Sequence, residues 1–504
     1  MYAKVESLGL NGLDAFSVTV EADISTGLPR FDIVGLPDMA VRESRERVRA
    51  TIKNGGYQFP VSRMTVNIAP ADVKKEGAVY DLPVFVALMK ASGQIHGSTD
   101  GCAFLGELSL DGEIRPCTGV LPMVLCAREK GLHAVFVPAA NRDEGSIVEG
   151  IDVLPVAHVR QVLDHLQGKA PVEPCYRAFS PEEDTLEYLD FADVKGQQNA
   201  KRALEIAAAG GHNCLMIGPP GTGKSMLAKR LPSILPEMTF EEQIETTKIY
   251  SIAGALPSGT RLISHRPFRS PHHTVSPQGL TGGGAVPKPG EISLAHNGVL
   301  FMDEFPEFDR RTKESLRQPL EDGVVTISRV QASLSFPARL ILITAQNPCP
   351  CGFLGDKVHS CTCRPHEIER YRRKISGPLL DRIDIQVTVP RLEYDDLKDK
   401  TEGESSAVIR SRVVKARGVQ RRRFEGSGVH CNAQMNKKQL NKYCKLEPQA
   451  EAMLGKYFAA LGLSARTHDR IVKVARTIAD LEGSADIKAA HVAEAIQLRT
   501  SVQR

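Results

Sequence analysis

The chain has 504 residues, too many for one hydrophobic core, so we expect two or three domains. Its 64 Lys and Arg against 60 Asp and Glu leave a net charge of +4, which identifies no polyanion partner by itself. Residues 1–30 lack the basic start and apolar run of a targeting signal, and no run of eighteen apolar residues occurs. We therefore expect a soluble cytoplasmic protein that does not contact a membrane.

Strand and helix patterns mix in the first third of the chain. Residues 16–34 and 64–69 predict strands, residues 38–54 carry apolar side chains at helical spacing, and residues 82–89 predict a buried helix. These patterns predict an α+β domain over residues 1–169. Whether its arginine-rich helix binds nucleic acid or only supports assembly stays open: Arg42, Arg45, Arg47 and Arg49. A segment rich in Pro, Glu and Asp then predicts a linker over residues 170–192.

A phosphate-binding loop follows a short predicted strand, 213–217, and opens a predicted helix. Its glycines let backbone N–H groups converge on phosphate oxygens, its lysine reaches the β and γ phosphates, and its serine is a magnesium ligand. The sequence therefore predicts ATP and Mg²⁺ as cofactors. The loop consists of Gly218, Pro219, Pro220, Gly221, Thr222, Gly223, Lys224 and Ser225.

Two further strands complete the predicted ATP site. Residues 298–305 form an apolar strand that ends in Asp303, a second magnesium ligand, and Glu304, which polarises the attacking water. A strand over 340–344 leads to Asn347, whose amide is suited to orient that water. The alternative for Asn347 is an asparagine in an ordinary turn.

Four of the eleven cysteines form two Cys-x-Cys pairs directly after Asn347: Cys349, Cys351, Cys361 and Cys363. Four thiolates can hold one zinc ion tetrahedrally in a structural site. Reduced free thiols and a redox pair remain alternatives, because the spacing is tighter than the common Cys-x-x-Cys knuckle.

The remaining chain, 393–504, is mostly helical by periodicity. Residues 409–424 contain seven Lys and Arg and no acidic residue, which suits either a phosphate backbone or a solvated helix.

Four segments occur together: the phosphate loop, Pro-Gly-Glu-Ile-Ser-Leu-Ala-His at 289–296, the acidic strand and Leu-Leu-Asp-Arg-Ile-Asp at 379–384. This combination resembles the magnesium-chelatase-like AAA+ ATPases, and within them the YifB/ComM group, over essentially the whole chain. The resemblance implies an α/β P-loop AAA+ core over residues 193–392 and a helical lid over 393–504. It also implies a homo-hexamer with ATP between neighbours, Arg382 as the arginine finger and Arg466 as the sensor-two arginine, with Arg470 as the substitute.

Residues 67–82 and 105–141 resemble the proteolytic domain of Lon, an S5-like α+β fold. The nucleophile position of those proteases is Val79 here, and the activating lysine is missing where Val120 and Leu121 follow Gly119. Valine cannot attack a peptide, so we expect this fold without its protease chemistry.

In the chelatase-like branch, which resembles MCM helicases here, the segment between the two ATP motifs is an insertion directed at the central pore. A predicted hairpin over 324–336 resembles the pre-sensor hairpin. Cations on such loops contact phosphates with little sequence preference, although surface loops are commonly basic. The candidate DNA contacts are Arg266, Arg269, His272, His273, Lys288 and Arg329.

The resemblance implies an ATP-driven hexameric DNA translocase or helicase. It would act on single-stranded and branched DNA and promote branch migration of recombination intermediates in natural transformation, with recombination proteins as further partners. The alternative is a chelatase-type subunit that remodels a protein partner.

Overall fold

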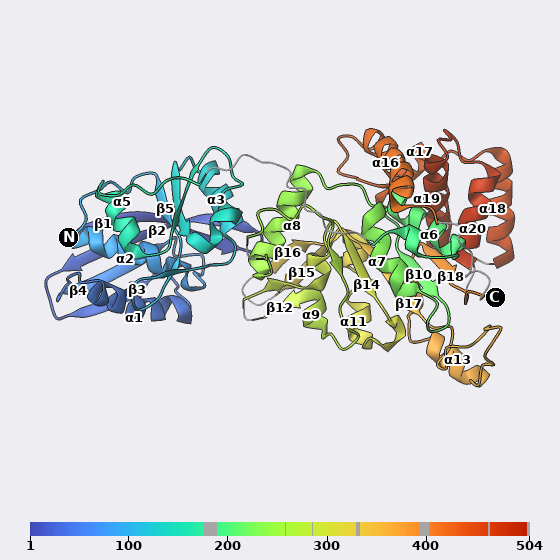
Figure 1. Ribbon diagram of the computed structural model, residues 1–504, viewed down its shortest axis with the longest axis horizontal. Coiled ribbons are helices and arrows are strands. Elements are labelled where there is room, and N and C mark those ends of the chain that lie inside the picture. Colours follow the sequence, from blue (N-terminus) through green and yellow to red (C-terminus); the bar gives the residue numbers. More distant parts are fainter. Residues whose placement is uncertain are drawn as a thin grey trace.

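The computed structural model describes residues 1–175, 189–257, 259–284, 286–328, 333–393, 403–461 and 464–500. Figure 1 shows an elongated molecule, with the N-terminal sheet at one end, a parallel sheet in the middle and helices from the last quarter of the chain at the other end. No helix in these ranges is long and apolar enough to cross a membrane.

The N-terminal part is built on a seven-stranded mixed sheet in the order β3-β4-β2-β1-β5-β8-β9. The predicted helices are present, the stretch 16–34 forms two strands, β2 and β3, and the sheet also contains β1, β5, β8 and β9, which the sequence patterns did not define. Its strands are β1 (Tyr2–Asn11), β2 (Asp14–Ser25), β3 (Arg30–Val34), β4 (Arg63–Ala69), β5 (Cys102–Phe104), β8 (Ala134–Pro138) and β9 (Asp152–Val156). Shorter elements are β6 (Glu107–Leu108), β7 (Ile114–Arg115) and α4 (Arg142–Gly145), and the main helices are α1 (Met39–Asn54), α2 (Asp81–Ala91), α3 (Val120–Glu129) and α5 (Val159–Leu166).

Helix α1 uses one of its arginines inside this part of the protein. Asp81, at the start of the buried helix α2, is fully buried and accepts hydrogen bonds from Arg47 Nε at 2.6 Å and Leu108 N at 3.1 Å. A buried carboxylate needs such partners. Arg47 therefore stabilises the packing of α1 on α2 and is not a free surface cation.

The central part is a five-stranded parallel sheet in the order β11-β14-β17-β10-β18. The residues of β10, β14 and β17 are all buried, so these three strands are continuous apolar runs, as expected for a parallel sheet covered on both faces. The strands are β10 (Cys214–Ile217), β11 (Phe268–Arg269), β14 (Val299–Met302), β17 (Ile341–Gln346) and β18 (Ile385–Thr388).

Helices and two hairpins surround the central sheet. The larger helices are α6 (Gln198–Gly210), α7 (Lys224–Ile234) and α8 (Phe240–Ala253), and the shorter ones are α9 (Pro277–Thr281), α10 (Glu291–Leu294), α11 (Arg310–Glu314), α12 (Pro319–Asp322), α13 (Pro365–Arg372) and α14 (Gly377–Leu380). One hairpin pairs β12 (Gly282–Gly283) with β13 (Lys288–Pro289). The hairpin predicted over 324–336 is also present, as β15 (Val324–Ser328) and β16 (Ser333–Pro337).

The C-terminal helices share one hydrophobic core with α6, α7 and the central sheet. They are α16 (Ser406–Arg423), α17 (Lys437–Tyr443), α18 (Pro448–Leu461), α19 (Ala465–Leu481) and α20 (Ala489–Thr500). A buried polar network adds directional contacts to this core. His212 Nδ1 lies 3.1 Å from Asp384 Oδ2, and His212 Nε2 lies 2.8 Å from the hydroxyl of Thr477 on α19. Arg470, also on α19, pairs with Asp384. Burial alone would raise the pKa of Asp384, but Arg470 and His212 hold it below its usual range.

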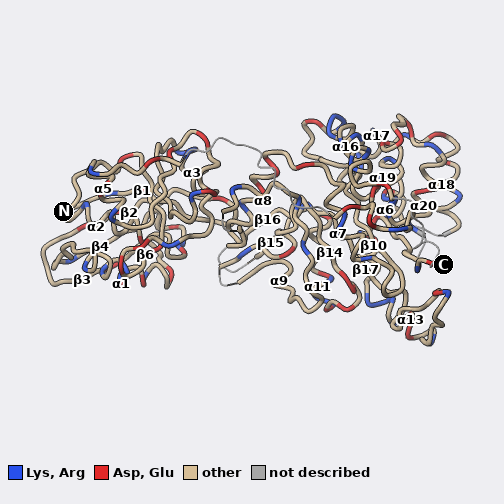
Figure 2. Tube along the Cα trace, in the orientation of Figure 1, with Lys and Arg blue, Asp and Glu red and all other residues tan. Residues whose placement is uncertain are grey.

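The basic stretch 409–424 lies largely on α16, where Figure 2 shows a group of blue segments, but it is not one free cationic face. Arg410, Arg412 and Arg423 pair with carboxylates, and Arg417 donates to the carbonyl of Ala208. These four arginines therefore have polar partners within this chain. The exposed cations that remain are Lys415, Arg421 and Arg422.

A buried carboxylate joins the N-terminal and central parts. Glu144 on α4 accepts hydrogen bonds from Leu121 N at 2.8 Å, from Asn141 Nδ2 at 3.2 Å and from the hydroxyl of Ser251 on α8. Burial raises the pKa of Glu144, while these donors oppose the shift. The Ser251 contact therefore fixes α8 against the N-terminal part of the chain.

Replacing Glu144 with alanine removes the acceptor shared by Leu121 and Ser251. We expect the free energy of unfolding to fall by about 1–3 kcal/mol, because buried donors lose their partner. Ser251→Ala, the matched control, removes only the contact between the two parts and should cost about 1 kcal/mol. Chemical denaturation measures the free energy of unfolding, and the rate of limited proteolysis within residues 170–192 reports on the contact between the two parts. Wild-type stability in Glu144→Ala would contradict the expectation.

Candidate active site

Three neighbouring strands deliver the predicted phosphate-binding and hydrolytic residues to one edge of the central sheet. In β14-β17-β10, Met302 pairs with Thr344 and Ile217 pairs with Gln346. The residues that follow these strands are Asp303 and Glu304, Asn347, and the loop 218–225. Because carboxyl ends of parallel strands meet at one edge, segments far apart in the sequence converge there.

The backbone of the loop 218–225 is shaped to receive an anion. Gly221 and Gly223 have φ values of 76° and 87°, which favour glycine, and a side chain on either would enter open space. Helix α7 begins directly after Gly223 without a side-chain cap. Its first N–H groups are therefore available to phosphate oxygens, unlike those of α8, which Thr239 and Glu242 cap.

Lys224 is buried at the start of α7 and is held by neutral acceptors. Its Nζ donates to the carbonyls of Gly218 at 2.7 Å and Pro219 at 2.8 Å, and lies 3.4 Å from Asn347 Oδ1. Burial lowers the pKa of Lys224 to about 8. An anionic phosphate would favour the charged form, so the arrangement fits a triphosphate.

Ser225 and Asp303 supply oxygen atoms suited to Mg²⁺. The Ser225 hydroxyl donates to Asp303 Oδ2 at 2.6 Å, so the two side chains can face one hard cation. This pair and the loop geometry fit the magnesium and nucleotide expected from the sequence.

Glu304 stands next to this pair in an unusual backbone conformation. Its φ of 48° costs a non-glycine residue on the order of 1 kcal/mol, and such strain is concentrated at functional sites. Its carboxylate is exposed, and one oxygen lies 3.4 Å from Nδ1 of His273. The sequence predicted His273 only as a DNA contact, and no local spacing could have linked it to Glu304.

Arg382 lies at the opposite edge of the sheet. The backbone N–H groups of Asp384 and Ile385 both donate to the carbonyl of Asn213, the residue before β10. Arg382, two residues before Asp384, therefore lies near the amino ends of β10 and β18. The phosphate loop follows the carboxyl end of β10. The four extended residues of β10 span about 13 Å, so they separate Arg382 from the phosphate loop of the same chain. Arg382 itself pairs with Glu321 and donates to Arg317 O at 3.1 Å.

Arg466 lies beside Arg382 in a cavity of about 160 Å³, which Arg470 and Lys473 also line. Arg466 is exposed and has no hydrogen bond or ion pair with any residue that the structure describes. Arg470 instead anchors α19 to the buried Asp384. Of the two arginines considered for sensor two, Arg466 is therefore the available one.

The cations of the insertion have different environments. Arg266 is mostly buried and donates to Pro236 O and Asn297 O, at 2.5 and 2.7 Å, and to Glu242. Arg269, on β11, makes two 2.7 Å hydrogen bonds to Glu291. Both arginines therefore stabilise the fold, which leaves His272 and Lys288 as the exposed candidates. Arg329 lies outside the described residues.

The positions of the Lon dyad are apolar in space as well as in sequence. Leu121 is buried, and Val79 packs against the same hydrophobic cluster. Separately, the four cysteine thiols that follow Asn347 lie within 4.8 Å of one another.

Comparisons with known proteins place these features in one family. Residues 190–397 match the family model "Magnesium chelatase, subunit ChlI", residues 20–141 match "Subunit ChlI of Mg-chelatase", and residues 403–499 match "Magnesium chelatase, subunit ChlI C-terminal". The chain is 43% identical to the uncharacterized protein YifB of Escherichia coli, over 97% of this chain and 95% of that protein. It is 42% identical to the competence protein ComM of Haemophilus influenzae, over 99% of this chain and 98% of that protein. A weaker match, 23% identical, covers 34% of the chain and 23% of the Lon protease of Mycolicibacterium smegmatis.

Two substitutions separate phosphate binding from hydrolysis at this site. Lys224→Ala removes the buried cation, and we expect it to prevent ATP binding measured by fluorescence titration. Glu304→Gln keeps the shape of the side chain but removes its charge, so ATP should bind while single-turnover hydrolysis falls at least about 100-fold. Wild-type turnover in either variant would contradict these roles.

Proposed function

The chain belongs to the YifB/ComM family of magnesium-chelatase-like AAA+ ATPases, and on that premise we propose that it is an ATP-driven, hexameric DNA translocase. It acts on single-stranded and branched DNA in the cytoplasm and promotes branch migration of recombination intermediates. The similarity to a competence protein supports a role in natural transformation, with recombination proteins as partners.

The observation that carries the proposal is the separation of Arg382 from the phosphate loop of its own chain. The two lie at opposite edges of the sheet, on either side of β10. A finger arginine so placed completes the site of a neighbouring subunit, which requires a ring or a similar closed assembly. Arg466 shares a cavity with Arg382, so both arginines approach the neighbour's γ-phosphate together.

Each residue of the site has a role that follows from its chemistry. The N–H groups of the loop and Lys224 bind the phosphates, and Ser225 and Asp303 would hold Mg²⁺, which neutralises phosphate charge when bound. Glu304 accepts hydrogen-bond donation from the attacking water, and Asn347 orients that water. The transferring phosphate is stabilised by Arg382 and Arg466 from the next subunit.

The insertion provides a route from DNA to this chemistry. His272 is exposed, and its ring lies 4.1 Å, centroid to centroid, from that of His273, which contacts Glu304. DNA held by His272 and Lys288 shifts this pair and releases Glu304 to act on water. ATP hydrolysis is therefore slow without DNA and faster with it.

A chelatase-type subunit that remodels a protein partner is the second candidate function. The three matches to models of magnesium chelatase subunit ChlI favour it. Its ATPase would respond to a protein and not to DNA, so ATPase rates with and without single-stranded, duplex and four-way DNA separate the two functions.

Arg382→Ala tests the shared site. We expect each subunit to keep its nucleotide affinity, because the loop is intact, while hydrolysis falls by on the order of 1000-fold. Arg382→Ala subunits mixed with Glu304→Gln subunits should not restore full activity. In such a ring only some interfaces combine an intact Glu304 with an intact Arg382. Full recovery, or wild-type turnover of Arg382→Ala alone, would contradict a site divided between subunits.

Replacing His272 and Lys288 with alanine tests the DNA contact. We expect affinity to fall similarly for all sequences, and the slope of log affinity against log salt to lose about one unit per phosphate contact. Stimulation of ATPase by DNA and movement of a four-way junction should fall together. Lys456→Ala, which removes an exposed lysine on α18, is the control and should change none of these. A double variant with the affinity and salt slope of the wild type would show that DNA is held elsewhere.

A further inference from the structure

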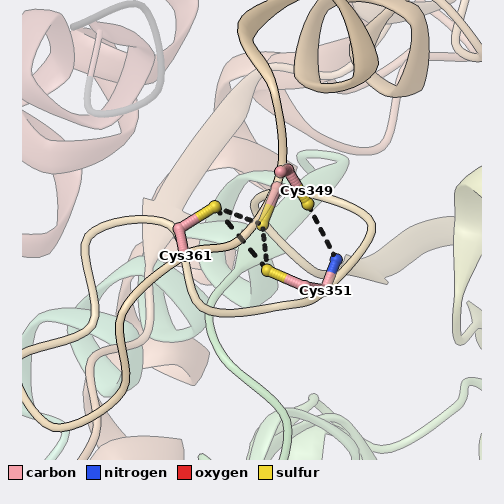
Figure 3. A group of neighbouring side chains, drawn as sticks. Cys349, Cys351 and Cys361 are labelled. Carbon is pink, nitrogen blue, oxygen red and sulfur yellow. Dashed lines mark hydrogen bonds between the residues drawn. The ribbon is translucent and has the colours of Figure 1, made fainter.

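The loop between β17 and α13 carries four thiols in a compact cluster. Figure 3 shows the side chains of Cys349, Cys351 and Cys361 directed toward one another. The sulfur atoms of Cys349 and Cys351 are 3.4 Å apart, those of Cys349 and Cys361 3.7 Å, and those of Cys351 and Cys361 3.6 Å. The backbone N–H of Cys351 donates to the sulfur of Cys363 at 3.3 Å.

These distances match a tetrahedral metal site better than a disulfide. A disulfide requires about 2.05 Å between sulfur atoms, and all four cysteines are free. Four thiolates around zinc, with Zn–S of about 2.3 Å, have sulfur atoms about 3.8 Å apart. Among the described residues no other group of three or more potential ligands lies so close together.

The cluster also gives structure to an otherwise irregular segment. No helix or strand lies between Gln346, the last residue of β17, and Pro365, the first of α13. Loops this long without regular structure are uncommon in compact domains and are usually functional. A tetrahedral metal would close this loop, with each ligand thiol releasing its proton to solvent.

The loop packs directly against the ATP site. Gly352 has a φ of 86°, and a Cβ added there would meet Pro220 Cδ of the phosphate loop at 2.7 Å and lie 3.8 Å from Cγ of Asn347. Asn347 itself precedes Cys349 by two residues and lies 3.4 Å from Lys224 Nζ. The position of the cysteine loop therefore sets the positions of Pro220 and Asn347.

We propose that Cys349, Cys351, Cys361 and Cys363 bind one zinc ion, and that the loop closed by the metal positions Asn347 and Pro220 for ATP hydrolysis. Zinc is the metal favoured by four thiolates in a closed tetrahedral site. The binding of zinc is independent of the proposed function, whereas its effect on turnover rests on the proposed ATPase.

Elemental analysis of the full-length protein, purified without chelators, tests the metal site. We expect about one zinc per chain, none in Cys351→Ser or Cys363→Ser, and an unchanged content in Cys175→Ser, which alters a free cysteine outside the cluster. Cobalt added to metal-free protein should give thiolate-to-metal charge-transfer bands. Four free thiols without metal, or a disulfide found by mass spectrometry, would overturn the proposal.

The positioning role needs a variant that keeps the metal. Gly352→Ala places a methyl group against Pro220, whereas Gly355→Ala, with a φ of 79° and open space around its Cβ, carries similar backbone strain without a contact. We expect both to retain zinc and only Gly352→Ala to lose kcat, by on the order of 10-fold or more, with a smaller change in KM. Equal kcat in both variants, or wild-type kcat in zinc-free Cys351→Ser, would overturn the positioning role. The metal site itself is tested separately, by the zinc content.

Discussion

The parallel alignment of β10, β14 and β17 is the constraint on which the site depends. Each strand is short, fully buried and followed at once by its functional residues. Because the strands are in register, they bring together the phosphate loop, the Asp303–Glu304 pair and Asn347, although these segments are far apart in the sequence. The strain at Glu304 and the close approach of Gly352 to Pro220 can be maintained because this buried sheet fixes the backbone beneath them.

The other edge of the same sheet organises a second set of residues. The buried contacts of Asp384 with His212 and Arg470 connect the start of β18 to α19, so Arg382 and Arg466 are held beside one cavity. One sheet thus presents a phosphate loop at its carboxyl edge and cations at its amino edge. A molecule built in this way is suited to head-to-tail assembly, in which each copy completes the site of the next.

The sequence predicted the features that depend on local spacing. The strand before the phosphate loop, the helix beginning at Lys224 and the hairpin over 324–336 follow from periodicity and turn chemistry, and the structure contains them. What the sequence could not show were contacts between residues far apart in the chain. Arg269 is neutralised by Glu291, Arg412 by Glu205, and His273 lies against Glu304, and none of these pairs has a spacing that sequence alone could identify.

The central claim is that each ATP site is divided between two subunits. It is tested most directly by specific ATPase activity as a function of protein concentration, measured together with molecular mass by light scattering. The account predicts almost no activity where the protein is monomeric and an increase in activity per chain that parallels assembly. Constant activity per chain down to concentrations at which only monomer is present would contradict it.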